Sequence, residues 1–464
     1  MAEPDLDSVD SEPVYFDTFE LIETEIVGDE ESHAEHGVSA SLMSQRKENN
    51  SSSALENFPA ELRAQILSSA PDLPSLRSLV RASPVLHAQY LHDRAGILCS
   101  CMERELDGFV LDAWALLRSR KHYIGSPRTD EKIKDFLKGY GGWISGAMPV
   151  RAVAEMHPSS VRWFAAYHLS VARPLAQRYA KWALANLEAL TSSSSSREDE
   201  QMRVDEDEIK LSRSEEIRIF RALYRCDTFH HLFGQTRGIR DSTDFERYEV
   251  NEMFCGLFEP WENEAVGTVD LFIREQYDKV FKEVTWDLSD ENPRFWEGGF
   301  DPSGSFHIEG EYDLARGLDI ASRILAIRDH EDLVTAMERY LTHSNEIDHR
   351  LNRVLSFVAQ ADRRDDSPNY PSTRDEAERR RDPLEFVSDS VPPDGPSLGW
   401  CILWKKKYTN MYAQLVPESL RRTGYVIWDS IRWDAIGCDL EELVAKGWAE
   451  DPKTCEWVEA MRGR

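Results

Sequence analysis

The residue types best suited to acid–base chemistry occur together in a glycine-rich stretch at residues 296–309. Its glycines permit tight turns, and His307 and Glu309 could act as a general acid and a general base. This stretch would then line the cleft of a helical enzyme or ligand-binding protein. A loop that only connects two helices has the same composition, so the sequence leaves both interpretations open.

Other signatures of catalysis are absent from the sequence. It contains no Gly-x-Ser-x-Gly, no phosphate loop ending in Gly-Lys-Ser/Thr, no His-Glu-x-x-His and no paired Cys-x-x-Cys. His343 and His349 are six residues apart, a spacing that places them on different helix faces rather than around a metal. Cys99 and Cys101 fit small core residues better than a redox pair. The sequence therefore predicts no catalysis of its own, no cofactor and no metal.

The composition limits the possible compartments and partners. The chain has 464 residues, 41% of them hydrophobic, and a net charge of −29, which disfavours a general binder of nucleic acid or anionic lipid. No apolar span or signal peptide is visible, and seven cysteines without a disulfide pattern favour a reducing compartment. We expect a cytoplasmic or nuclear protein without a membrane segment. The basic runs 379–381 and 405–407 are compatible with nuclear import or with solvated surfaces.

Three polar stretches divide the chain. Thirteen of its acidic residues and no lysine or arginine lie within residues 1–45, and serine-rich or Pro-, Asp- and Arg-rich stretches follow later. The predicted domains are a disordered acidic tail at 1–54, a helical module at 55–95, the first segment of a helical body at 96–190, a disordered acidic insert at 191–213, the second segment of that body at 214–361, a disordered linker at 362–397, and a Trp-rich region at 398–464 that packs on the body.

Apolar residues recur mostly with helical spacing. Leu318, Ala321 and Leu325 follow each other at three- and four-residue intervals, and the aromatic series from Trp400 to Leu415 would lie along one side of a single helix. Possible short strands are confined to 305–309 and 424–428. We therefore predict a mainly α fold with a large non-repeating helical domain.

Residues 55–95 carry the most distinctive pattern. Pro59, Pro74 and Pro84 each precede an apolar-periodic run, at positions where proline favours the first turn of a helix. Three short helices are expected. Their inward faces would be formed by Leu62, Ile66, Leu67 and Ala70, by Leu76, Leu79 and Val80, and by Leu86, Tyr90 and Leu91. Because about 40 residues cannot bury these faces alone, the module must pack on a neighbour or a partner.

This segment resembles an F-box of the degenerate, fungal type, the motif by which substrate receptors attach to a Skp-type adaptor in cullin-RING ubiquitin ligases. Phe58-Pro59-Ala60-Glu61-Leu62 matches the opening of the family pattern, with Phe in place of the first Leu. Ile66-Leu67, the Leu76 to Val80 run and Ala82-Ser83 continue the match. Two departures are the small Ala70 at the end of the first helix and Leu86 where many members carry Trp.

The resemblance implies a role for each matched residue. Phe58, Pro59, Ile66 and Leu67 would contact the adaptor, and an F-box core would be formed by Leu62, Leu76, Leu79, Val80 and Leu86. The chain would then bridge a Skp-type adaptor, and through it a cullin, to an unknown protein target as a non-catalytic ligase subunit. No propeller or leucine-rich repeat is present to hold the target. Binding of the adaptor outside a ligase is an alternative.

Overall fold

The computed structural model describes residues 55–125, 128–150, 152–191, 209–234, 245–287, 292, 317–341, 351–355 and 373–462. They form two compact units: the first contains the described residues up to Val110 together with Val150–Arg173, and the second contains Leu111–Pro149 and those from Pro174 onward. Within the described residues there is no strand, only an isolated bridge between Pro383 and Lys407. The predicted mainly α fold class is confirmed.

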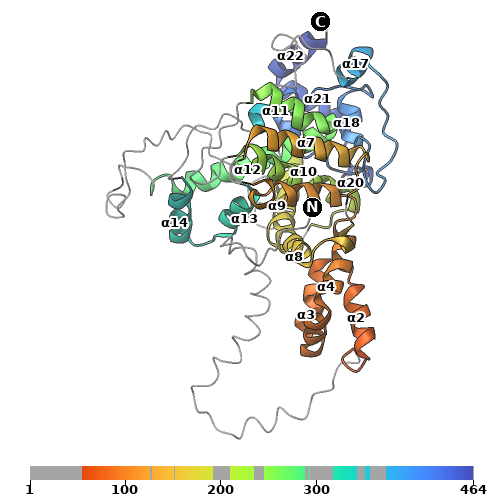
Figure 1. The fold of residues 1–464 in the computed structure, drawn as a ribbon. Coiled ribbons are helices and arrows are strands. Elements are labelled where there is room, and N and C mark those ends of the chain that lie inside the picture. The colour runs from red at the N-terminus through yellow and green to blue at the C-terminus, as the bar shows by residue number, and fades with distance from the viewer. Residues whose placement is uncertain are drawn as a thin grey trace. The chain divides into compact units, whose positions relative to one another are not determined.

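The first unit is built around one long helix. Both α2 (Ala60–Ser68) and α3 (Leu73–Ala82) pack along α4 (Pro84–Glu105), as Figure 1 shows, and α8 (Pro158–Tyr167) packs against the same helix. The short turns η2 (Val153–Glu155) and η3 (His168–Ala172) complete the unit. The three predicted helices therefore exist, but the third runs well beyond residue 95. Residues 152–173, which the sequence assigned to the helical body, pack against the second half of α4. This added contact gives the small module a core.

Local capping explains where these helices begin. The Asp72 carboxylate accepts a hydrogen bond from the backbone N–H of Ser75 at 2.7 Å, and Pro74 occupies the first turn of α3. The Ser83 hydroxyl accepts from the N–H groups of Val85 and Leu86 at the start of α4. Because each cap satisfies backbone donors that a helix leaves unpaired, α3 and α4 begin at these residues, while α2 begins after Pro59 without a side-chain cap.

The second unit has two long helices at its centre, α10 (Arg213–Phe233) and α12 (Pro260–Val284), which pack against each other. Capping boxes start both: Ser212 with Glu215, and Glu259 with Glu262. The other elements are α5 (Val110–Ser119), α6 (Lys121–Ile124), α7 (Asp130–Ile144), α9 (Arg173–Thr191), α11 (Arg247–Phe254), η4 (Cys255–Leu257), α13 (Leu318–Ala326), α14 (His330–Leu341), α15 (Leu351–Leu355), α17 (Thr373–Arg380), α18 (Leu398–Leu403), η5 (Ala413–Leu415), α19 (Glu418–Arg422), α20 (Ser430–Ile436), α21 (Leu440–Glu450) and α22 (Pro452–Arg462).

The Trp-rich region is buried as predicted, but its secondary structure differs from the prediction. Most of its tryptophans lie in the interior, namely Trp400, Trp404, Trp428 and Trp433, whereas Trp457 is exposed. The aromatic series does not form one helix, because the chain leaves the helix after Leu403 and turns through positive φ angles at Lys405 and Lys406. The predicted strand at 424–428 is wrong as well; these residues form a turn at the end of α19.

The predicted linker at 362–397 needs a correction. Residues 373–380 form α17, and the chain after it is tied to the second unit by ion pairs, including Asp389 with Arg218. A segment poor in apolar residues can be held this way when its carboxylates meet arginines from elsewhere in the chain. Residues 362–372, the tail at 1–54, most of the insert at 191–213, and the loop at 296–309 with its predicted strand lie outside the described residues.

Candidate functional site

The turn before α2 is fixed against two helices of the first unit. Arg63 donates to the backbone oxygen of Glu56 at 3.0 Å, and the Ser83 hydroxyl donates to the Glu56 carboxylate at 2.6 Å. Arg63 also reaches the side-chain oxygen of Gln89 on α4, at 3.4 Å. These contacts hold the chain that carries Phe58 and Pro59 in one position relative to α2 and α4.

Apolar side chains lie on the outer face of α2 and of the turn before it. Phe58 is 40% exposed, Leu62 is 43% exposed, Pro59 is exposed and Ile66 is half-buried. Leu62 and Ile66 are four residues apart on α2, the spacing that places side chains on one helix face, and Phe58 and Pro59 lie in the turn just before this helix. We call Phe58, Pro59, Leu62 and Ile66 the apolar ridge. The structure brings these four together as a surface.

The structure exchanges the predicted roles of Leu62 and Leu67. Leu67 was expected to contact a partner but has no exposed surface, while Leu62 was expected in the core and faces solvent. The reason is helical geometry: each residue turns the helix by about 100°, so Leu67 cannot share the outer face with Leu62 and Ile66. In this structure the inner face of α2 is formed by Leu67, followed by buried Ala70 in the turn after the helix.

Most of the remaining predicted core residues are inside. Leu76, Val80 and Leu86 are buried, and Leu79 is half-buried. Leu91 is the exception, because Tyr90 takes the inward position on α4 and Leu91 is 45% exposed. Leu55, which no predicted face includes, is also exposed. In the sequence, only its position three residues before Phe58 could have indicated that Leu55 lies near the outer face of this turn.

A buried carboxylate locks the helices of the first unit together. Glu105, at the end of α4, accepts from the backbone N–H of Leu73 at 3.0 Å and from Arg173 at 2.6 and 2.9 Å. His168 Nε2 lies 2.9 Å from the same carboxylate. Burial by itself would raise the pKa of Glu105, but the hydrogen bonds and charges of His168 and Arg173 outweigh it and lower that pKa to about 2. The beginning of α3 and the end of α4 are thus fixed to one anionic group.

Replacing Glu105 with glutamine is therefore expected to loosen the first unit in a pH-dependent way. The folded-state pKa is below the ordinary value of 4.5, so the carboxylate stabilises the unit above about pH 4.5, and this contribution is lost as the pH falls toward 2. Near pH 7 the wild type should protect the amides of α3 and α4 from hydrogen exchange by about 2–3 kcal/mol more than the variant.

The check is a hydrogen-exchange comparison of the wild type and Glu105→Gln between pH 7 and pH 3, corrected for intrinsic exchange rates. The difference in protection should shrink as the pH approaches 3. Glu103→Gln, which removes an exposed carboxylate from the same helix, should show no such difference. A gap between wild type and Glu105→Gln that stays constant over this range would contradict the assigned role of the ionised group.

Other chemistry finds little support in the described residues. Burial raises the pKa of the Cys101 thiol to about 12, so it stays protonated and a poor nucleophile near neutral pH. In the described part of the chain no cluster of three His, Cys, Asp or Glu side chains is arranged to hold a metal. None of its helices combines the length and apolarity needed to cross a bilayer. His307 and Glu309, the predicted acid–base pair, lie outside the described ranges.

Comparison with known proteins does not extend this description. No family model matches the sequence, no curated protein matches it, and no solved structure matches the fold.

Proposed function

We propose that this protein is a substrate receptor of a Skp-cullin-F-box type ubiquitin ligase, in which the apolar ridge binds a Skp-type adaptor. The observation that carries the proposal is the ridge itself: Phe58, Pro59, Leu62 and Ile66 are accessible on helices fixed by Glu56, Arg63 and Glu105. The F-box resemblance, in which Phe58, Pro59 and Ile66 are expected to contact the adaptor, supplies the identity of the partner. The second unit would hold the target.

The ridge suits protein binding because its helices are already ordered. Covering an exposed Leu or Phe contributes about 1.5–3 kcal/mol when the burial is complete. Side chains held by a fixed backbone lose less conformational freedom on binding than those of a flexible segment, so more of this contribution appears as affinity. No charged group of the ridge has to be desolvated.

The mechanism would be proximity rather than catalysis. With one end of the chain on the adaptor and a target on the other, the target stays near a ubiquitin-loaded conjugating enzyme that the cullin complex supplies. The bond-forming steps then belong to other subunits. This explains why the proposal needs no catalytic residues, cofactor or metal in this chain.

The proposal is tested by measuring adaptor binding with Leu62→Asp. An unpaired carboxylate at the centre of an apolar contact is costly to bury, so the affinity for a Skp-type adaptor should fall by at least about 100-fold. Leu62 is exposed in the free protein, so folding should be preserved. Ile436→Asp is the matched control, because Ile436 is 41% exposed, also lies on a helix and does not belong to the ridge.

Titration calorimetry with purified adaptor gives the affinities, and capture from cell extract shows whether a cullin comes with it. We expect the adaptor and cullin with wild type and Ile436→Asp, and neither with Leu62→Asp. Adaptor without cullin would indicate a role outside a ligase. Equal adaptor binding by wild type and Leu62→Asp, or binding by neither, would reject the ridge as an adaptor site.

A further inference from the structure

Three arginines in the second unit lie along one side of α10 and line a pocket. Arg218, Arg221 and Arg225, here called the arginine row, recur at three- and four-residue spacing. With Trp261 and Pro393 they line a small pocket. The row is unusual in a chain whose net charge is −29, and guanidinium groups in such a row are well suited to carboxylate or phosphate ligands.

An acidic segment of the chain itself lies against this row. We call residues 386–396 the strap. Asp389 accepts from Arg218 at 2.7 Å, and Asp394 accepts from Arg221 at 2.8 Å. The Pro393 carbonyl lies 3.4 Å from the second Arg221 nitrogen. The strap thus occupies the row as an acidic peptide would, with a carboxylate on each of two guanidinium groups.

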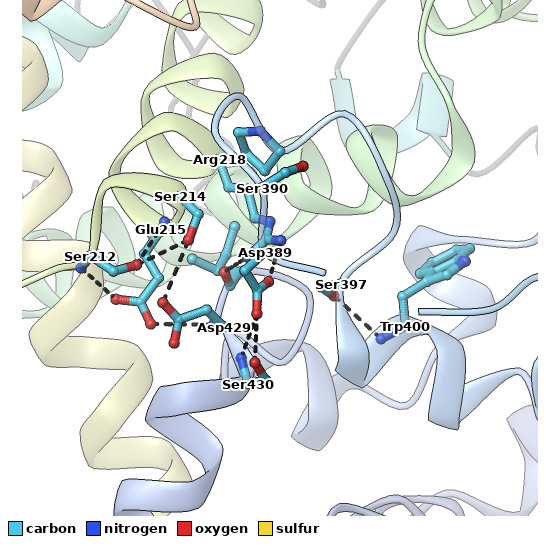
Figure 2. Close-up of polar contacts among 12 residues, drawn as sticks. Ser212, Ser214, Glu215, Arg218, Asp389, Ser390, Ser397, Trp400, Asp429 and Ser430 are labelled. Carbon is cyan, nitrogen blue, oxygen red and sulfur yellow. Dashed lines mark hydrogen bonds and ion pairs between the residues drawn. The ribbon is translucent and has the colours of Figure 1, made fainter. Parts of the chain in front are cut away.

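The two carboxylates of the strap are held to different degrees. Figure 2 shows Asp389 between Arg218 and Ser430, whose backbone N–H and hydroxyl both donate to it at 2.8 Å. The Asp389 side chain is 11% exposed, whereas that of Asp394 is 72% exposed. An exposed ion pair contributes little, about 0–1 kcal/mol, so the Asp394 end is the weaker attachment.

Buried apolar side chains contribute little to holding the first half of the strap in place. Val387 is 89% exposed and Val391 is 52% exposed, so the side chains that could anchor this segment hydrophobically face solvent. In the second half Pro393 and Pro396 are buried, so there apolar contacts add to the ion pairs of Asp389 and Asp394. The two ion pairs are the part of this attachment that another segment with similar charges could replace at the same arginines.

The pocket would remain able to bind an acidic group if the strap left. Arg225 is anchored from behind by Asp112 at 2.7 Å and by Glu262 at 2.9 Å. Without the strap, Arg218 and Arg221 would lose the carboxylates of Asp389 and Asp394, while Arg218 would keep the Ile427 carbonyl at 3.0 Å and Arg221 would keep Glu262 at 3.7 Å. Trp261 lines the pocket, and its indole N–H is buried and has no acceptor among the described residues. It is a donor that an incoming acidic group could satisfy.

We infer that the arginine row is a binding site for an acidic peptide segment of the target, and that the strap is its internal competitor. This deepens the proposed function by giving the chemistry of the target segment. Only the identification of that segment with a ligase target rests on the proposed function. The competition is intramolecular, so the strap acts at an effective concentration in about the millimolar range and lowers the affinity for any peptide added from outside.

The test uses a fluorescein-labelled peptide with the sequence of residues 386–396 as the probe, and fluorescence anisotropy with the full chain. Asp394→Asn weakens the strap by up to about 1 kcal/mol, so this variant should bind the peptide about two- to fivefold more tightly than the wild type. Adding Arg221→Gln to Asp394→Asn should remove that gain. Glu385→Gln, which changes an exposed carboxylate just before the strap, should behave as the wild type does.

A second measurement keeps the proposal testable if Asp394→Asn does not fold. Excess unlabelled peptide added to the wild type should speed hydrogen exchange within the strap, because the peptide displaces it. Equal peptide affinity of a folded Asp394→Asn and the wild type, retention of the gain with Arg221→Gln, or unchanged strap exchange would overturn the proposal. No adaptor is present in these experiments. A negative result here therefore overturns only the peptide site, whereas unchanged adaptor binding by Leu62→Asp overturns only the proposed function.

Discussion

Replacing Arg225 with methionine is expected to lower the free energy of unfolding of the second unit by about 3–5 kcal/mol. The Arg225 guanidinium is buried between Asp112 and Glu262, and it lies 4.2 Å from the centre of the Phe258 ring. The Tyr140 hydroxyl donates to the same Asp112 carboxylate at 2.6 Å. Methionine would fill much of the space but leave the buried Asp112 carboxylate without its cation.

The direction of the pKa shifts agrees with this assignment. Burial alone would lower the pKa of Arg225, but Asp112 and Glu262 raise it above its ordinary value. Burial together with the neighbouring Asp112 charge also raises the pKa of Tyr140. The group therefore consists of one cation, two carboxylates and a neutral phenol. Removal of the cation should lower the stability more than removal of any other member, because it leaves both carboxylates without it.

Urea denaturation followed by tryptophan fluorescence would measure the loss, with two comparison variants. Arg213→Met removes an arginine of the same helix whose pair with Glu216 is partly exposed, and it should cost no more than about 1 kcal/mol. Adding Asp112→Asn to Arg225→Met removes the stranded charge and should recover some of the stability. Equal losses for Arg225→Met and Arg213→Met would show that the buried charge group contributes little.

Features set by neighbouring residues could be predicted from the sequence. Asp72, Ser83 and Asp439 cap α3, α4 and α21, and Pro452 starts the last helix. Such signals are local, because a cap needs only the next two or three backbone N–H groups. The helical class and the three-helix start of the first unit followed from the same kind of information.

The rotation of α2 could not be predicted in this way. Its apolar residues include both Leu62 and Leu67, and which of them faces inward depends on what covers the helix. The cover is α4, whose length and kink at Asp93 no local pattern reveals. A face prediction from spacing alone is therefore uncertain wherever apolar residues occur on more than one side of a short helix.

The polar strap escaped prediction for a different reason. Residues 386–396 have few buried apolar side chains, so their composition predicted a linker. They are held because Arg218 and Arg221, more than 160 residues earlier, supply cations. The group formed by Asp112, Tyr140, Arg225 and Glu262 is similarly dispersed along the chain. Only the folded chain shows which charges meet.

Gly399→Ala is expected to be the other severe substitution, with a loss of about 3 kcal/mol or more in the stability of the second unit. A Cβ atom at Gly399 would lie 2.3 Å from the backbone oxygen of Tyr425 and 3.2 Å from its carbonyl carbon. A flexible side chain could move away from such an overlap, but a backbone carbonyl next to buried Val426 and Trp428 cannot move freely. The strain would therefore reach the interior of the Trp-rich region.

Gly395→Ala provides the matched control, because the two glycines are four residues apart and a Cβ at Gly395 would meet nothing within 4 Å. Its effect should stay within about 1 kcal/mol and could be stabilising, since alanine restricts the unfolded chain more than glycine does. Both variants can be compared by urea denaturation with tryptophan fluorescence. Similar midpoints for the two would mean that α18 can shift away from Tyr425, which would contradict the close packing that buries Trp400 and Trp428.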